Sequence, residues 1–291
     1  MFKSIITRLL DYIKALPLYC LPQHGLTAIV YKLTRIENKI WKNNLIKLFI
    51  RLFKVDMEQA IWSREEDYSC FNSFFTRHLK PGARNWKKAE KNILSPVDGA
   101  VSQIGKINND KLIQAKGYDY SLKRLLANDE EAIKRFQHGC FTTLYLSPRD
   151  YHRIHMPVSG KLIRTIFVPG DLFSVNSASV RTIGQLFTRN ERFISLFETE
   201  LGLMAQIMVG AMFVGSMETV FSGLITPTQH REIRIKKHEE ESIRLEQAEE
   251  FGHFNMGSTV ILLFEKDKIS WAEELKENKP IQVGQIIARR L

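Results

Sequence analysis

Apolar residues recur every three or four positions in two stretches of the first 54 residues, which is the spacing of one face of an α-helix. The first stretch comprises Phe2, Ile5, Ile6, Leu9, Leu10, Ile13 and Leu16. The second comprises Ile36, Ile40, Trp41, Leu45, Leu48, Phe49, Leu52 and Phe53. The polar positions of the second stretch include four basic residues: Lys39, Lys42, Lys47 and Arg51. The pattern predicts basic amphipathic helices within a helical region of residues 1–80.

The pattern changes after Pro81-Gly82, where short apolar runs alternate with Gly, Pro and Asn, as in antiparallel strands. The predicted strands lie at residues 93–94, 101–104, 141–146, 161–168, 205–214 and 260–264. Helical segments are expected at 121–136 and 179–187, and the charge-dense residues 236–250 are expected at a solvated edge. The sequence therefore predicts an α+β fold, in which a mainly antiparallel, β-rich, barrel- or sandwich-like core (residues 81–291) follows the helices.

The formal net charge of +10 is concentrated at one end of the chain. Residues 1–54 contain ten lysines and arginines against two acidic residues, so they carry +8 of that charge. Such a basic pole suits a polyanionic partner, either nucleic acid or anionic lipid. Broad aliphatic faces with Trp and Phe favour helices that lie in a membrane interface. We expect an anionic membrane as partner and no nucleic acid; packing of these helices on the rest of the chain is the alternative.

No segment is predicted to cross a membrane. The most apolar stretch, residues 201–215, is shorter than the roughly 20 residues of a spanning helix and contains Gln206, so paired buried strands explain it better. No signal peptide is expected, because Arg8, Asp11 and Lys14 interrupt the apolar run near the N-terminus. Three widely spaced cysteines indicate reduced thiols in a cytosolic compartment: Cys20, Cys70 and Cys140.

Three polar residues of catalytic type fall in two short segments. Asp98 lies in "SPVDGAV", where Pro, Asp and Gly are typical of a turn. His152 and His155 lie three residues apart in "SPRDYHRIHMP". A metal would need further ligands at matching spacing, and no convincing set is nearby, so no metal is expected. The two histidines are either structural or general acid–base groups, because histidine titrates near neutral pH.

A fourth candidate, Ser258, lies between a turn and an apolar strand in "FNMGSTVILLF". The G-x-S-x-G pattern of a hydrolase elbow is absent. Gly257 has no side chain to block approach to its carbonyl, so a constrained turn could hold the Ser258 hydroxyl near that carbon. A histidine to take the proton and a carboxylate to orient it would complete the activation, with His155 or His152 and Asp98 as candidates. Taken alone, the triplet is also explained as an ordinary turn.

Six segments in order resemble the prokaryotic-type phosphatidylserine decarboxylases, a family of pyruvoyl enzymes. They are "FFTRHLKPGAR", "SPVDG", "YHRIHMP", "VPGDLFSVN", "VGAMFVGS" and "FNMGSTVILLF", and they span roughly residues 70–265. The segments are chemically unrelated, so their joint occurrence is specific. Two positions depart from the family pattern: Met256 stands where Leu is usual, and Ala248 stands where Gly usually makes a tight turn. Met has a similar apolar volume, so processing should survive, whereas Ala248 puts the loop shape in question.

The resemblance implies that the chain cleaves itself between Gly257 and Ser258. The serine hydroxyl would attack the glycine carbonyl to give an ester. Elimination would then leave dehydroalanine, which water would hydrolyse to a pyruvoyl group at position 258 with loss of ammonia. The products would be a β chain, 1–257, and an α chain, 258–291. Asp98, His155 and Ser258 align with the self-processing triad of the family, and His152 aligns with the histidine of the decarboxylation step.

The resemblance also implies the reaction and its place. Phosphatidylserine would form a Schiff base with the pyruvoyl cofactor, lose carbon dioxide, and be protonated by a histidine to phosphatidylethanolamine. The substrate is an anionic membrane lipid, which suits a peripheral protein at the cytoplasmic face of the cell membrane. A homodimer of the cleaved pair would fit the family. Two alternatives are a serine hydrolase using Ser258, His155 and Asp98, and a non-catalytic membrane-surface module.

Overall fold

The computed structural model describes residues 11–13, 15–115, 118–213, 216–226, 232–238, 240–257 and 259–291. Its N-terminal part contains η1 (Leu16–Tyr19), α2 (Gln23–Leu33), α3 (Lys39–Phe53), η2 (Glu65–Asp67) and α4 (Phe71–Phe75). The second amphipathic stretch predicted from the sequence is α3, whereas most of the first stretch lies outside the described residues. Helix α3 ends where Lys54 takes a left-handed conformation, with φ of 53°. The chain from there to α4 is largely irregular, so the prediction of helix throughout residues 1–80 was wrong at that place.

Among the described residues, the rest of the chain forms antiparallel sheets with four short helices. The strands are β1 (Asn92–Leu94), β2 (Gly99–Lys106), β3 (Lys111–Ala115), β4 (Tyr118–Ser121), β5 (Cys140–Tyr145), β6 (Arg153–His155), β7 (Gly160–Val168), β8 (Arg192–Thr199), β9 (Gly202–Val209), β10 (Met217–Thr219), β11 (Gly223–Leu224), β12 (Arg234–Lys237), β13 (Arg244–Leu245), β14 (Glu250–Phe254), β15 (Thr259–Phe264), β16 (Ile269–Trp271), β17 (Pro280–Ile281) and β18 (Ile286–Arg290). The helices are α5 (Leu122–Leu125), α6 (Glu130–Phe136), α7 (Ser177–Thr182) and α8 (Leu186–Arg189), in the two segments predicted to be helical.

The largest sheet runs in the order β12-β7-β8-β9-β15-β5-β2-β17, with β13 also paired to β7. Its end strands, β12 and β17, do not pair with each other among the described residues, so the sheet is open and is not a closed barrel. The predicted α+β fold with an antiparallel core is thus confirmed. The apolar run after position 258 is the central strand β15, which is buried along its whole length between β5 and β9.

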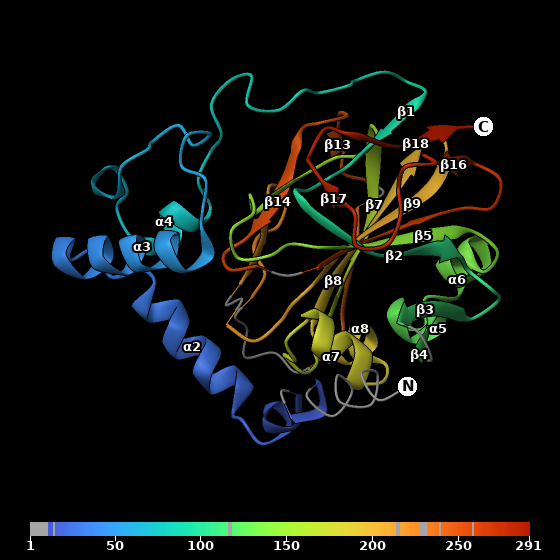
Figure 1. Ribbon diagram of the computed structural model, residues 1–291. Coiled ribbons are helices and arrows are strands. Elements are labelled where there is room, and N and C mark those ends of the chain that lie inside the picture. The colour runs from blue at the N-terminus through green and yellow to red at the C-terminus, as the bar shows by residue number, and fades with distance from the viewer. Residues whose placement is uncertain are drawn as a thin grey trace.

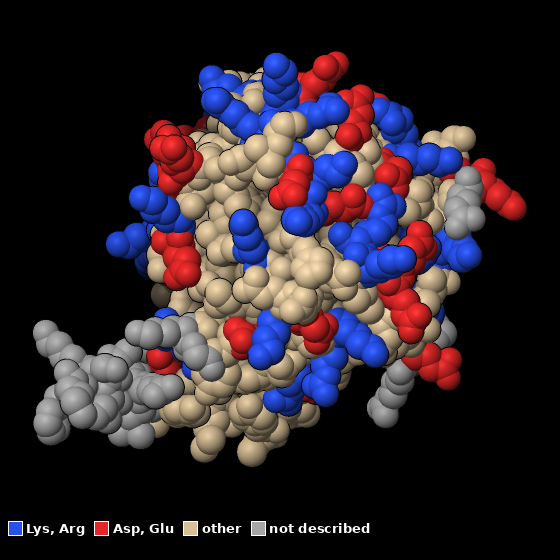
Figure 2. Space-filling model, turned by 90° about the vertical axis from the view of Figure 1, so that its right-hand side faces the viewer, with Lys and Arg blue, Asp and Glu red and all other residues tan. Residues whose placement is uncertain are grey.

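Helices α2, α3 and α4 lie to one side of the β core, on the left in Figure 1. Within α3 the buried side chains are Lys42 and Ile46. The burial of Lys42, a residue predicted on a polar face, has a local reason: its ammonium donates to the carbonyl of Glu65 at 3.0 Å and to Asn43 Oδ1 at 2.7 Å. On the face turned away from these helices, basic and acidic side chains are interspersed (Figure 2). No helix in the described residues has the length and apolar character needed to cross a bilayer.

Candidate active site

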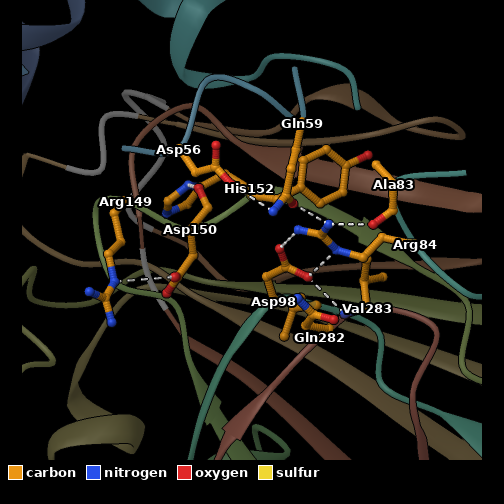
Figure 3. A network of polar contacts seen from close by, with 12 residues as sticks. Asp56, Gln59, Ala83, Arg84, Asp98, Arg149, Asp150, His152, Gln282 and Val283 are labelled. Carbon is orange, nitrogen blue, oxygen red and sulfur yellow. Dashed lines mark hydrogen bonds and ion pairs between the residues drawn. The ribbon is translucent and has the colours of Figure 1, made fainter. Parts of the chain in front are cut away.

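Asp98 lies in the turn between β1 and β2 and is held in a buried ion pair. Its carboxylate accepts hydrogen bonds from Arg84 Nε at 3.0 Å, from Arg84 Nη2, and from the backbone N–H of Val283 at 2.8 Å. Figure 3 shows the Arg84 guanidinium facing this carboxylate, with Gln59 and Ala83 as its further acceptors. A buried, fully paired carboxylate of this kind is fixed in place, and removal of either partner would leave an uncompensated charge.

His155 lies on β6, with both ring nitrogens in hydrogen bonds. Its Nδ1–H donates to the carbonyl of Ala248 at 2.9 Å, and its Nε2 accepts from the Tyr151 hydroxyl at 3.1 Å. The ring also packs against Trp86, with ring centroids 4.8 Å apart. Burial lowers the pKa of His155, so the neutral imidazole is favoured. Ala248 keeps the left-handed backbone that a glycine would favour, with φ of 71°, so the predicted departure at this position leaves the turn in place.

The side-chain hydrogen bonds of Asp98 and His155 go to other partners, although the charge of Asp98 acts on the His155 ring and raises its pKa against the larger effect of burial. Among the hydrogen bonds of the described residues, none joins the Asp98 carboxylate to the His155 ring, because Arg84 takes the first and Tyr151 and Ala248 take the second. Asp98 therefore makes no direct hydrogen bond to His155 in this arrangement, and the grouping of Asp98, His155 and Ser258 as a triad stays a prediction.

His152 is completely buried and is the histidine nearest to residue 257. Its Nδ1–H donates to the carbonyl of Asp150 at 2.8 Å, which leaves the lone pair on Nε2. That Nε2 has no hydrogen-bond partner within the part of the chain that the structure describes. Burial and the nearby charge of Arg77 lower the pKa of His152 to about 3, so the ring is neutral. Phe75 packs on it, with ring centroids 4.1 Å apart.

Ser258 lies outside the described residues, but its neighbour Gly257 is placed. A β-carbon built on Gly257 would lie 2.6 Å from His152 Nε2 and 3.2 Å from the carbonyl oxygen of Leu146. The free nitrogen of His152 is therefore in direct reach of the peptide that precedes position 258. Of the candidates from the sequence, the structure brings His152 to the G-S-T segment and places Asp98 and His155 in separate hydrogen-bond networks.

An apolar pocket of about 220 Å³ lies beside Gly257. Its walls include Phe49 and Phe53 of α3, Phe75 of α4, and Met256. An apolar hollow between an outer helix and residue 257 suits the apolar part of a ligand. A second pocket of about 260 Å³ is polar and is lined by Arg77, Arg84, Asp98, Arg149, Asp150 and Tyr151 among others.

Sequence reasoning missed Arg84 and Tyr151 as members of the site. Both fall inside or beside segments that carry the family resemblance, "KPGAR" and "YHRIHMP". A single arginine in a loop has no spacing signal, however, and its carboxylate partner is 14 residues away in a different turn. The tyrosine, four residues before His155, could only have been found by asking what occupies the second nitrogen of that ring.

Comparisons with known proteins point to one family. The model of the phosphatidylserine decarboxylase family matches residues 71–289, and a second model, described as PSD, matches residues 13–54. A phosphatidylserine decarboxylase proenzyme of Psychromonas ingrahamii is 44% identical over 283 residues, which is 97% of this chain and 99% of that protein. One of Nitrosococcus oceani is 45% identical over 98% of this chain and 94% of its own length.

One of Methylococcus capsulatus is 45% identical over 91% of this chain and 92% of its own length. The matched regions include the buried Asp98 turn, the strand that carries His155, and the G-S-T segment beside His152. Because identity of this degree extends over nearly the whole length of each protein, the chain belongs to the phosphatidylserine decarboxylase family, as its six ordered segments predicted.

Proposed function

We propose that this chain is a carboxy-lyase that decarboxylates phosphatidylserine to phosphatidylethanolamine after cleaving itself between Gly257 and Ser258. The observation that carries the proposal is the unpartnered, buried Nε2 of His152 against Gly257, within the G-S-T segment of the family. Buried polar groups are almost always satisfied, so an exception next to a reactive peptide points to a chemical role.

Self-cleavage begins when the Ser258 hydroxyl adds to the carbonyl carbon of Gly257. The new C–O bond replaces the peptide C–N bond, and a base must accept the hydroxyl proton. We assign that base to His155 and its electrostatic support to Asp98. Since Tyr151 now occupies His155 Nε2, this step requires the tyrosine to give up its hydrogen bond. Elimination across residue 258 then breaks the ester bond, which leaves a β chain, 1–257, that ends in a carboxylate and an α chain, 258–291.

The surroundings of residue 257 fit a small carbonyl group at position 258, because a buried nitrogen without a partner stands ready to accept or give a proton. A pyruvoyl group made from Ser258 would supply the carbonyl electron sink that loss of carbon dioxide requires. His152 would carry the proton at Nε2. Burial and Arg77 lower the pKa of His152, so the ring rests neutral and must take up a proton at Nε2 before it can give one to carbon.

We also propose that residues 1–80 associate the protein peripherally with the cytoplasmic face of the cell membrane. Of the twenty-two large apolar side chains exposed among the described residues, fifteen fall between Tyr12 and Trp62. On α3, Ile40 is 75% exposed and Leu52 is 65% exposed, among basic residues. Such a surface fits a helix that lies in the interface of an anionic bilayer, where the substrate is found. A homodimer of the cleaved pair remains a prediction.

The membrane proposal is tested with vesicles containing phosphatidylserine. Leu48→Ser combined with Leu52→Ser should reduce co-sedimentation of the protein, because two apolar side chains leave the interface. The matched control is Leu224→Ser, which alters a residue of equal kind, 50% exposed, on the β core. Equal loss of binding in both variants would contradict the assignment of α3 as the membrane face.

Denaturing mass spectrometry of the purified protein tests the catalytic proposal. We expect two fragments that meet after Gly257, the smaller one lighter than its serine-terminated form by one ammonia. Ser258→Ala should stay intact, and His155→Ala should cleave slowly or not at all. His152→Ala should still cleave and lose turnover. An intact wild-type chain that reacts with a serine-directed reagent would indicate a hydrolase, and an intact, unreactive chain would indicate a membrane-surface module.

A further inference from the structure

The segment that leads into the cleavage site is tied to the N-terminal helices by a buried amide. Strand β14 ends at Phe254 and β15 begins at Thr259, so residues 255–257 lie outside both strands. Asn255 is 2% exposed. Its side-chain carbonyl accepts a hydrogen bond from Asn72 Nδ2 at 2.8 Å, and its amide donates to Ser216 Oγ. The side chain of Asn255 thus joins α4 to the approach to residue 257.

The backbone of Asn72 is held by hydrogen bonds at both its N–H and its carbonyl. Its backbone N–H donates to the carbonyl of Thr34, which caps α2, at 2.9 Å. Its carbonyl accepts from the backbone N–H of Thr76 at 2.9 Å and from the hydroxyl of the same residue at 3.0 Å. The Thr76 carbonyl in turn accepts from Arg153 Nε at 2.9 Å, on the strand that carries His155. The Asn72 side chain therefore connects the N-terminal helices to the segment that leads to residue 257.

The next residue along the chain reinforces this connection through apolar contacts. Met256 packs against the main core and also against a second cluster formed by Ile46, Val55, Tyr68, Phe71, Phe74 and Phe75. That cluster includes Phe75, whose ring lies on His152. The same helices thus position both the peptide to be cleaved and the histidine beside it.

We propose that Asn72 and Asn255 are positioning residues for self-cleavage, and that α4 is part of the processing site. Their hydrogen bond holds the short link 255–258 so that the Gly257 carbonyl is presented to the hydroxyl of the next residue. Intramolecular attack depends steeply on geometry, and a misplacement of about 1 Å can cost about 10²-fold in rate. This inference rests on the proposed cleavage after Gly257, and it adds the residues that set its geometry.

The test follows cleavage of freshly translated precursor by denaturing mass spectrometry, with the unfolding temperature measured in parallel. Asn72→Ala and Asn255→Ala should each slow cleavage about 10- to 100-fold. The double variant should be no slower than the slower single variant, because the two residues act through one hydrogen bond. If Asn255→Ala fails to fold, Asn72→Ala carries the test, since Asn72 is only half-buried.

The matched control is Gln114→Ala, because Gln114 is also a buried amide, remote from residue 257 in the chain. Its side chain bonds to the carbonyls of Val180 and Ile183 and to the N–H of Leu186. The control should lower the unfolding temperature and yet cleave at close to the wild-type rate. Slowing of cleavage that simply follows the unfolding temperature in all variants would overturn the proposal.

Hydroxylamine separates two points at which cleavage could fail, because it splits an ester and leaves a peptide bond intact. The proposal places the defect before the ester forms, so hydroxylamine should not release fragments from either variant. Fragments released from the variants would overturn the proposal, and so would variants that cleave at the wild-type rate. A wild-type chain that never cleaves would instead overturn the proposed function on which this inference rests.

Discussion

A methyl group at residue 257 should stop the chain from cleaving itself efficiently. In Gly257→Ala the new carbon would lie 2.6 Å from His152 Nε2, where ordinary contact begins at 3.4 Å, so the two atoms must separate by about 0.8 Å. The His152 ring cannot retreat easily, because Phe75 packs on it and its Nδ1–H is bonded to the Asp150 carbonyl. The Leu146 carbonyl, 3.2 Å from the new carbon, limits escape on another side.

The magnitude follows from that displacement. Overpacking of a filled site costs typically about 1–3 kcal/mol. A shift approaching 1 Å in the attacked carbonyl costs about 10²-fold in rate, equivalent to about 2.7 kcal/mol of barrier. The half-time of fragment formation from freshly translated precursor, followed by denaturing mass spectrometry, should therefore lengthen about 100-fold.

A second substitution tests whether the clash is the cause. His152→Ala in the Gly257→Ala background removes the obstructing ring, so cleavage should recover towards the rate of His152→Ala alone while decarboxylation stays lost. Wild-type cleavage of Gly257→Ala would refute the steric reasoning. A double variant that remains as slow as Gly257→Ala would show that His152 is not the obstacle.

Three further predictions concern stability. Burial lowers the pKa of His152 to about 3, so below about pH 6.5 the unfolded chain binds a proton that the folded chain excludes. The free energy of unfolding, measured by urea titration, should therefore fall as the pH decreases from 6.5 towards 3, by at most about 1.4 kcal/mol per pH unit from this group, and less in His152→Gln. Burial raises the pKa of Glu191 from 4.5 to about 7, so its contribution is lost as the pH rises through 7, and Glu191→Gln should raise the unfolding temperature at pH 8 more than at pH 4.5. Ala248→Gly should raise the unfolding temperature by relieving a left-handed alanine worth about 1 kcal/mol, with cleavage preserved; an unchanged or lower temperature would contradict that reading of its φ of 71°.

The sequence predicted the elements that obey local rules. Strand β15 follows from five consecutive apolar residues bounded by a turn, and α3 from its 3.6-residue period. The hydrogen-bond partners of Asp98 could not be predicted from local rules. Its partners, Arg84 and Val283, are brought together by the tertiary fold, the second of them from 185 residues away.

Lys42 illustrates the same limit on a helix. Its spacing places it on a polar face, but the carbonyl of Glu65 comes close enough to accept from its ammonium, so the side chain is buried. Which face of an amphipathic helix meets the rest of the protein depends on neighbours that the periodicity does not specify. The same holds for Tyr151, because its hydrogen bond to His155 depends on the path by which the chain enters β6.

The central place of β15 has a consequence for what cleavage leaves behind. The segment after residue 258 contains β15, β16, β17 and β18. Of these strands, β15 pairs with β5 and β9, β17 pairs with β2, and β18 pairs with β1, all in the segment before it. A cut at that point would turn a single folding unit into two interlocked fragments without changing a hydrogen bond of the sheet. Unfolding of the cut protein would then become a dissociation, and its refolding would depend on protein concentration, as for a dimer. Folding of the uncut precursor would not depend on protein concentration, because all strands belong to one chain. Refolding of the cut protein would require its two fragments to meet again.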